Sequence, residues 1–119
     1  MDAKLDGVKA VFLDLDGTIY LGGNLIPGAL EFLSRCEKQG VQRYFLSNNS
    51  SRSVDQYVAK LQKMNIPCTP EDVLLSTHDL LAWLQKEGVT KTWAIATKGM
   101  CQMMEDVGIS TRDGTPEYV

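Results

Sequence analysis

Apolar and polar positions along the chain alternate between two patterns, which predict strands and helices in turn. Short, nearly continuous apolar runs indicate buried strands, whereas apolar residues three or four positions apart indicate amphipathic helices. The short runs predict strands over residues 8–13, 44–46, 73–75 and 93–96, and the start of another over 116–119. The helical spacing predicts helices between Pro27 and Gly40, from Ser53 to Met64, from Thr77 to Gly88, and from Met100 to Gly108.

This alternation predicts the fold class. Strands that alternate with helices form right-handed βαβ units, so we expect an α/β fold with a Rossmann-like, mostly parallel sheet and flanking helices. Such sheets bind ligands beyond the carboxyl ends of their strands. Asp14 and Ser47 each stand where a predicted strand ends. We therefore expect a site that contains both residues.

Three polar residues are expected to cap helical segments. Ser53 and Thr77 precede helical apolar spacing, where a side-chain oxygen can accept from a free backbone N–H. Thr69 is followed by Pro70, a combination that predicts a brief helical turn before the third strand.

Two carboxylates follow the first predicted strand in the sequence DLDGT, residues 14–18. A buried charge is costly unless it is paired or coordinates a metal. Because side chains alternate along an extended segment, Asp14 and Asp16 should point to the same side while Leu15 packs away from them. Gly17 allows a sharp turn and a close approach of the backbone to a ligand. This arrangement suits Mg²⁺ together with a phosphate group.

The two carboxylates then have separate candidate roles. Asp14 is the candidate nucleophile, which attacks phosphorus and forms an acyl phosphate. Asp16 is the candidate general acid and base, which protonates the leaving oxygen and later takes a proton from water. The alternative is a solvated Asp-Gly turn, which is the better interpretation for Asp6-Gly7. For two carboxylates directly after a buried strand we favour the catalytic interpretation.

A second polar cluster, FLSNNSS, spans residues 45–51. Ser47 presents a hydroxyl at a strand end, and Asn48 and Asn49 supply amides before a helix N-terminus, where anions are favoured. The alternative is a polar loop that only caps the following helix. Beside Asp14 across a βαβ unit, Ser47 becomes a candidate donor to phosphate.

Together these motifs resemble the haloacid dehalogenase superfamily of phosphatases. The segment IYLGGNLIPGALEFL, residues 19–33, is similar to the p-nitrophenylphosphatase and NagD-like subclass, which carries a large α/β cap. The resemblance implies that Asp14 is the nucleophile and a metal ligand. It implies that Asp16 is the general acid and base and ligates Mg²⁺ through its main-chain carbonyl. The implied phosphate site comprises Asp16, Gly17, Ser47, Asn48 and Asn49, and residues 17–24 correspond to a flap beside the nucleophile.

Two further motifs of the superfamily, a lysine and a final acidic metal ligand, have no counterpart that fits. Lys98 is expected at a helix start, and Glu105 and Asp106 on an exposed helix side. The resemblance therefore implies an N-terminal part of the family's chain. We expect an incomplete core over residues 1–88 and the beginning of the cap over residues 89–119. Because the cap selects the substrate in this family, the substrate is not predicted.

Composition narrows the classes of partner. The 119 residues carry a net charge of -3 with an isoelectric point near 5.0, which argues against nucleic-acid and anionic-membrane binding. No apolar run approaches the roughly 20 residues of a membrane span, and no signal-peptide pattern is present. The three cysteines are expected to be small buried thiols. We expect a cytoplasmic protein that acts on a small phosphorylated metabolite.

Three functional hypotheses follow. The first is a Mg²⁺-dependent phosphomonoester hydrolase with an aspartyl-phosphate intermediate. Under this hypothesis the short chain is either active or inactive by itself. The second is a catalytically incompetent, truncated isoform that binds a partner or forms a homodimer through apolar faces exposed by its partial core. The third is a phosphoacceptor receiver domain. It ranks last because its phosphorylated Asp should lie at a mid-chain strand end rather than on the first strand.

Overall fold

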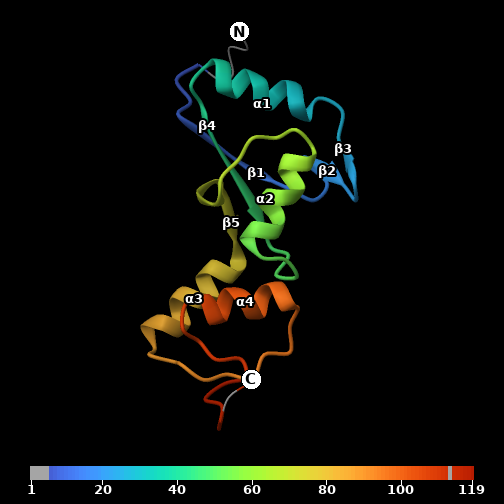
Figure 1. Ribbon diagram of the computed structural model, residues 1–119. Coiled ribbons are helices and arrows are strands. Elements are labelled where there is room, and N and C mark those ends of the chain that lie inside the picture. Colours follow the sequence, from blue (N-terminus) through green and yellow to red (C-terminus); the bar gives the residue numbers. More distant parts are fainter. Residues whose placement is uncertain (1–5, 113) are drawn as a thin grey trace. The chain divides into compact units, whose positions relative to one another are not determined.

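The computed structural model describes residues 6–112 and 114–119 (Figure 1). Strands and helices alternate along these residues, so the predicted α/β class is confirmed. The elements are β1 (Ala10–Asp14), β2 (Tyr20–Leu21), β3 (Asn24–Leu25), α1 (Ala29–Lys38), β4 (Gln42–Ser47), α2 (Val54–Lys63), the 3₁₀ turn η2 (Pro70–Asp72), β5 (Val73–Leu75), α3 (Ser76–Lys86) and α4 (Lys98–Asp106).

The main sheet has three strands in the order β1-β4-β5, with β4 in the centre. β1 and β4 run parallel, and Asp14 lies opposite Leu46. β2 and β3 form a small antiparallel hairpin, with Tyr20 opposite Leu25. As an edge strand, β1 is not fully buried, and its Phe12 is 60% exposed. The sheet order brings the ends of β1 and β4 to the same edge.

The described contacts divide the chain into two compact units. The first contains the residues up to Ser47 together with Val58–Leu74, and the second contains Asn48–Tyr57 together with Leu75–Val119. The boundary passes through α2, whose first turn belongs to the second unit. The division predicted from the sequence, at residue 88, remains a prediction about the family's core and cap.

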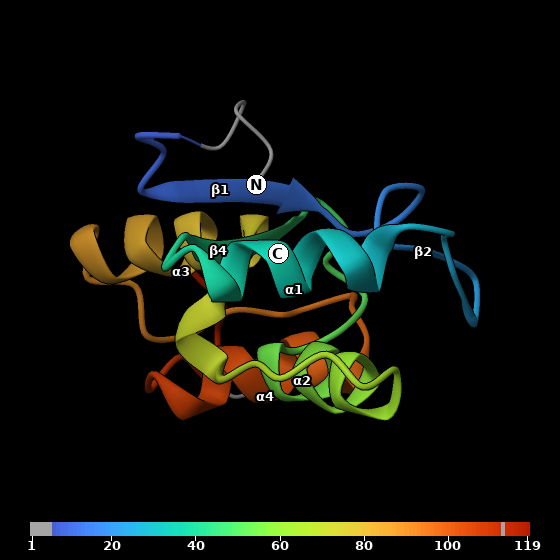
Figure 2. The same cartoon turned by 90° about the horizontal axis from the view of Figure 1, so that it is seen from above.

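In the first unit α1 lies against β4 (Figure 2). α1 begins after Gly28, whose φ of 92° lies in the left-handed region that favours glycine. Its apolar side buries Leu33 and Cys36, and Cys36 packs with Val41, the residue just before β4. Phe45 of β4 is fully buried. The helical spacing that predicted α1 therefore corresponds to a buried helix side.

The second unit has its own apolar core, formed by α3, α4 and the segments after them. The buried members are Leu81, Leu84, Val89, Met104 and Ile109. Of the predicted methionine stripe, Met104 is buried and Met100 and Met103 are half-buried. The last predicted helix is thus confirmed, with its apolar side toward α3.

The prediction of a strand over residues 93–96 is wrong. Its neighbourhood forms only isolated pairings, Lys91 with Ser110 and Thr92 with Tyr118. The backbone N–H groups of Thr92 and Ala94 donate to residues 110 and 111, whereas that of Trp93 donates to Tyr118. The segments that supply these pairings are too short to continue a ladder of strand hydrogen bonds. Ile95, inside the predicted strand, is 96% exposed. An apolar run needs long neighbouring strands, as well as the right side chains, to become a strand.

The start of α3 differs from the prediction in its capping residue. The helix begins at Ser76, so Thr77 lies inside it and is buried at 2% exposure. The backbone N–H of Leu75 donates instead to Nδ1 of His78, at 3.1 Å. The imidazole therefore satisfies an N–H that has no partner within the helix.

Replacing His78 with alanine is expected to lower the free energy of unfolding by about 1 kcal/mol, the usual cost of a lost helix-start bond. Urea titration followed by circular dichroism would measure it. His78→Gln is the matched control, because glutamine at this position can also accept from the Leu75 N–H. Equal losses in the two variants would contradict the capping role.

Of the cysteines, Cys36 and Cys68 are buried and Cys101 is half-buried, and all three are free thiols. Burial raises the pKa of the Cys36 thiol. Burial, and then the negative charge of Asp72, raise the pKa of the Cys68 thiol. These two side chains act as small apolar groups, as the sequence predicts. Within the described residues no helix has both the length and the hydropathy of a membrane span.

Candidate active site

The two predicted carboxylates lie at and just after the carboxyl end of β1. Asp14 is the last residue of the strand, and the N–H of Leu15 continues the pairing by donating to the carbonyl of Leu46, at 3.2 Å. Leu15 is fully buried, whereas Asp14 and Asp16 are both exposed. The alternation expected from the sequence is therefore present. It leaves both carboxylates open to solvent and to a ligand.

A tight turn follows the carboxylates. The carbonyl of Leu15 accepts from the N–H groups of Thr18 and Ile19, at 3.2 and 3.0 Å. Gly17 has a φ of 82°, in the left-handed region, and its N–H donates to the carbonyl of Tyr20 at 2.8 Å. Glycine is needed here for its backbone conformation. The turn leads directly into the β2–β3 hairpin, the segment that the resemblance assigns to the flap.

Lys60 of α2 packs on this hairpin. Its Nζ lies 3.9 Å from the ring centroid of Tyr20, which is fully buried. A cation over an aromatic ring is attracted by the negative face of the ring. Lys60 thus holds the base of the hairpin from a helix that is distant in sequence, and no motif in the sequence indicates this contact.

Ser47 is the last residue of β4 and is 6% exposed. Because β1 and β4 are parallel neighbours and Asp14 lies opposite Leu46, Ser47 stands one residue beyond that pair at the same sheet edge. The predicted meeting of these two strand ends is therefore present in the structure. Asp14, Asp16, Gly17 and Ser47 all belong to the first unit.

Asn48 and Asn49 belong to the second unit and are both exposed. The side-chain oxygen Oδ1 of Asn49 accepts from the N–H of Ser51, at 2.9 Å. The carbonyl of Asn48 accepts from Oγ of Ser76 at 3.3 Å, and the carbonyl of Asn49 accepts from the Tyr57 hydroxyl at 3.4 Å. Hydrogen bonds within the second unit thus hold the backbone carbonyls of both asparagines.

The donor set at the end of β1 fits a magnesium ion. Asp14 and Asp16 offer only oxygen, and both are exposed. Within residues 6–112 and 114–119, no three or more His, Cys, Asp or Glu side chains gather as a metal cage. Mg²⁺ is commonly held by one or two carboxylates, with water and substrate phosphate oxygens completing its coordination. The residues present therefore suit such a shared site better than a closed protein cage.

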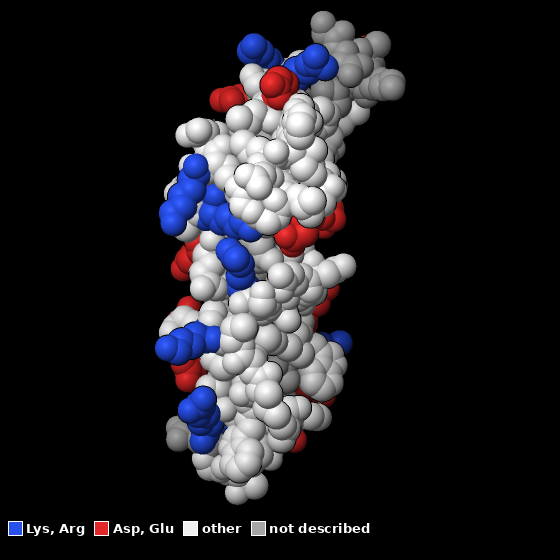
Figure 3. Space-filling view, turned by 90° about the vertical axis from the view of Figure 1, so that its right-hand side faces the viewer, with Lys and Arg blue, Asp and Glu red and all other residues white. Residues whose placement is uncertain are grey.

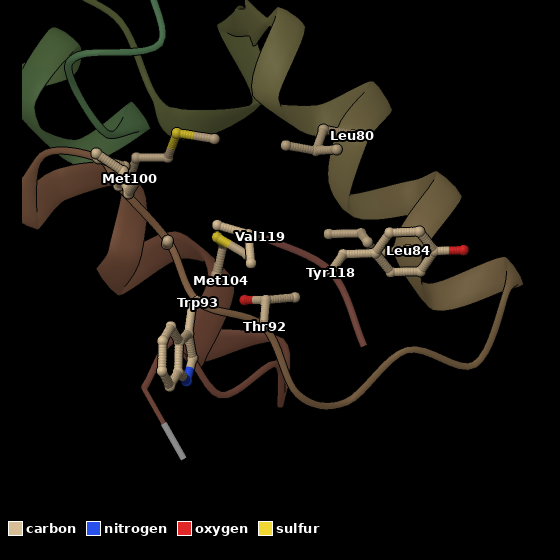
Figure 4. Close-up of a pocket in the computed structure, with 11 residues that line it drawn as sticks. Leu80, Leu84, Thr92, Trp93, Met100, Met104, Tyr118 and Val119 are labelled. Atoms are coloured by element: carbon tan, nitrogen blue, oxygen red, sulfur yellow. The ribbon is translucent and has the colours of Figure 1, made fainter. Parts of the chain in front are cut away.

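An apolar pocket in the second unit is lined by residues of α3, α4 and the segments that follow these helices. Figure 4 shows a pocket of about 350 Å³ with Leu80, Met104 and Tyr118 among its lining residues. None of the predicted site residues lines it. On the face seen in Figure 3, acidic and basic side chains are scattered over a mostly uncharged surface.

A sequence profile described as haloacid dehalogenase-like hydrolase matches residues 11–110, which include both strand-end motifs. The chain belongs to the haloacid dehalogenase-like hydrolase family. The resemblance to this superfamily and to its p-nitrophenylphosphatase and NagD-like subclass is confirmed by the relatives of this chain.

Relatives of this haloacid dehalogenase-like chain are named phosphatases. The acid sugar phosphatase of Staphylococcus aureus (strain USA300) is 38% identical over 113 residues, or 93% of this chain and 44% of that protein. The crystal structure of 4-nitrophenylphosphatase from Thermotoga maritima matches with a TM-score of 0.84 and 30% identity, over 94% of this chain and 43% of that chain. The crystal structure of a glycerol phosphate phosphatase from Mycobacterium tuberculosis in complex with magnesium matches with a TM-score of 0.73 and 27% identity, over 85% of this chain and 30% of that chain. This chain thus spans less than half the length of each of these three proteins.

Proposed function

We propose that this chain carries the nucleophile side of a Mg²⁺-dependent phosphomonoesterase that works through an aspartyl-phosphate on Asp14. The observation that carries the proposal is the placement of Asp14 and Ser47 at the same edge of the β1–β4 pair. An exposed carboxylate and a hydroxyl at the ends of neighbouring strands suit a phosphate ester. The phosphatase names of the relatives support the same reaction class.

In the first step a carboxylate oxygen of Asp14 attacks phosphorus, and the bond from phosphorus to the ester oxygen breaks. Asp16 gives its proton to the departing alkoxide, which leaves as an alcohol. Ser47 donates its hydroxyl hydrogen to a phosphoryl oxygen and orients the group for attack. In the second step Asp16 takes a proton from water, and the resulting hydroxide displaces Asp14 from phosphorus. Inorganic phosphate leaves and the Asp14 carboxylate is restored.

The cation would be held by the Asp14 carboxylate and the main-chain carbonyl of Asp16. When bound, it offsets the repulsion between a carboxylate and a phosphate dianion. The open position of both aspartates leaves room for substrate oxygens to complete the coordination. Small phosphorylated metabolites are the proposed substrate class, with sugar phosphates and glycerol phosphate tested first. We also propose a cytoplasmic location, which the free, buried thiols of Cys36 and Cys68 support.

Removing divalent metal with EDTA is expected to abolish hydrolysis of p-nitrophenyl phosphate, and adding Mg²⁺ back should restore it. The assay is run on this chain and beside it on any longer natural form. A second measurement follows a single turnover: incubation with acetyl phosphate and Mg²⁺ should add one phosphoryl group to the peptide that contains Asp14, detected by mass spectrometry. Absence of both hydrolysis and labelling in every form would overturn the proposed function.

A further inference from the structure

We propose that Thr97, at the start of α4, is a positioning residue for the polar loop Asn48–Ser51 that follows Ser47. The inference rests on the proposed function and on the family resemblance, which assigns Asn48 and Asn49 of this loop to the phosphate site. Every contact that carries it lies within the second unit. Thr97 acts through the backbone of the loop and does not itself touch phosphate.

The hydroxyl of Thr97 makes two hydrogen bonds. Its Oγ1 donates to the carbonyl of Ser51 at 2.7 Å and accepts from the N–H of Met100 at 3.3 Å. The second bond caps α4, and so the hydroxyl is held in place by the helix. The first bond ties that fixed hydroxyl to the loop. One side chain therefore links the helix start to the loop backbone.

Ser51 links the hydrogen bond of Thr97 to the side chain of Asn49. The carbonyl of Ser51 is held by Thr97, while its N–H donates to Oδ1 of Asn49 at 2.9 Å. Both backbone polar groups of Ser51 are thus engaged, which restricts the rotation of this residue. The Asn49 side chain takes its orientation from that N–H. Loss of the Thr97 bond should therefore loosen the amide of a proposed phosphate-binding residue.

Gly99, two residues after Thr97, shows how closely α4 approaches the same segment. A Cβ at Gly99 would collide with Oε1 of Gln56 and would lie 3.0 Å from the backbone nitrogen of Ser53. Ser53 and Gln56 form a reciprocal pair at the start of α2, with bonds of 2.8 and 3.2 Å. The first turn of α4 therefore packs on the start of α2, just after the loop, and a side chain at position 99 would have to displace Gln56.

Two other side chains also hold the loop, at longer distances. Ser76 donates to the carbonyl of Asn48 at 3.3 Å, and Tyr57 donates to the carbonyl of Asn49 at 3.4 Å. The Thr97 bond, at 2.7 Å, is the shortest of the three side-chain bonds to the loop carbonyls. Among the three donors, Thr97 should therefore have the largest effect on the loop when it is replaced.

The test replaces Thr97 with valine, which keeps the shape of the side chain and removes both hydrogen bonds. Thr97→Ser keeps the hydroxyl. Thr92→Val is the matched control, because Oγ1 of Thr92 donates to the carbonyl of Ser110 at 2.9 Å in the same unit, in a bond that does not involve the loop. Two quantities are measured: amide hydrogen exchange of residues 49–53, and the Kd for inorganic phosphate with Mg²⁺ present, by ³¹P NMR.

Thr97→Val should speed exchange at the Ser51 amide and weaken phosphate binding, each by about three- to tenfold, the range expected for one hydrogen bond. Thr97→Ser should match the original chain in both. Thr92→Val should lower the unfolding midpoint and leave both quantities unchanged. If Thr97→Val does not fold, Thr97→Ala, which also removes both hydrogen bonds, replaces it with the same expectation.

Unchanged exchange at Ser51 in Thr97→Val, or the same acceleration in Thr92→Val, would overturn the positioning role. The two readouts separate this inference from the proposed function. If the original chain binds no phosphate, the phosphate role of the loop fails, whereas the exchange measurement still decides whether Thr97 holds it. If phosphate binds and neither readout responds to Thr97→Val, the proposed function stands and this inference fails.

Discussion

Replacing Asp14 with asparagine is expected to reduce phosphate-ester hydrolysis by at least about 10⁴-fold, since loss of a covalent nucleophile removes the reaction path that depends on it. The neutral amide is a poor nucleophile and a weaker ligand for Mg²⁺. Asp14 is exposed at the end of β1, and asparagine has nearly the same shape, so the fold should be retained. Steady-state kinetics and the single-turnover labelling of the Asp14 peptide would measure the effect.

Asp6→Asn provides the matched control for this substitution. Asp6 also precedes a glycine and is also exposed, but it lies before β1 rather than at its carboxyl end. Its replacement should leave hydrolysis and labelling unchanged. If Asp14→Asn kept its full turnover, or if both variants lost activity equally, Asp14 would not be the nucleophile. Urea unfolding of each variant separates a chemical loss from a loss of structure.

The largest effect on stability is expected for Phe45→Ala. Phe45 is fully buried in the central strand of the sheet, opposite Leu13, and the Arg43 guanidinium lies 5.8 Å from its ring centroid. Truncating a buried phenylalanine leaves a cavity and costs about 3–5 kcal/mol. That is a large part of the stability of a small domain, typically about 5–15 kcal/mol. Urea titration should therefore show a strongly lowered midpoint, or a chain that is largely unfolded without urea.

The control for this prediction is another phenylalanine in the same sheet. Phe12 of β1 is 60% exposed and stacks on Tyr44, with ring centroids 5.3 Å apart. Phe12→Ala should cost only about 1 kcal/mol, the contribution of an exposed aromatic pair. Comparable losses at the two positions would show that burial in the central strand is not what makes Phe45 important.

The sequence predicts much of this fold because its signals are local. The apolar stripe that ends before Gly40 is enough to predict α1, and Ser53 does cap α2, with its Oγ accepting from the Gln56 N–H. The strand predicted over residues 93–96 fails because a strand depends on its neighbours, and here the pairings are isolated. Thr77 fails as a cap because α3 begins at Ser76, which puts the N-cap position at Leu75, two residues before Thr77.

In the candidate site too, local sequence signals were predictable and contacts between distant residues were not. Asp14 and Ser47 could be placed at one sheet edge from the sequence, because parallel neighbouring strands end together. The bond from Thr97 to Ser51 could not be predicted, since those residues are 46 positions apart and Thr97 belongs to no motif found in the sequence. The contact of Lys60 with Tyr20 could not be predicted from the sequence for the same reason. Residues that carry chemistry leave local patterns, whereas those that hold them in place leave none.

The bond from the Leu75 N–H to His78 also fixes the tautomer of the only histidine in the chain. Because Nδ1 accepts, the hydrogen of the neutral ring must reside on Nε2. The start of α3 therefore depends on one tautomer of one side chain, because only the ring with its hydrogen on Nε2 can hold the Leu75 N–H.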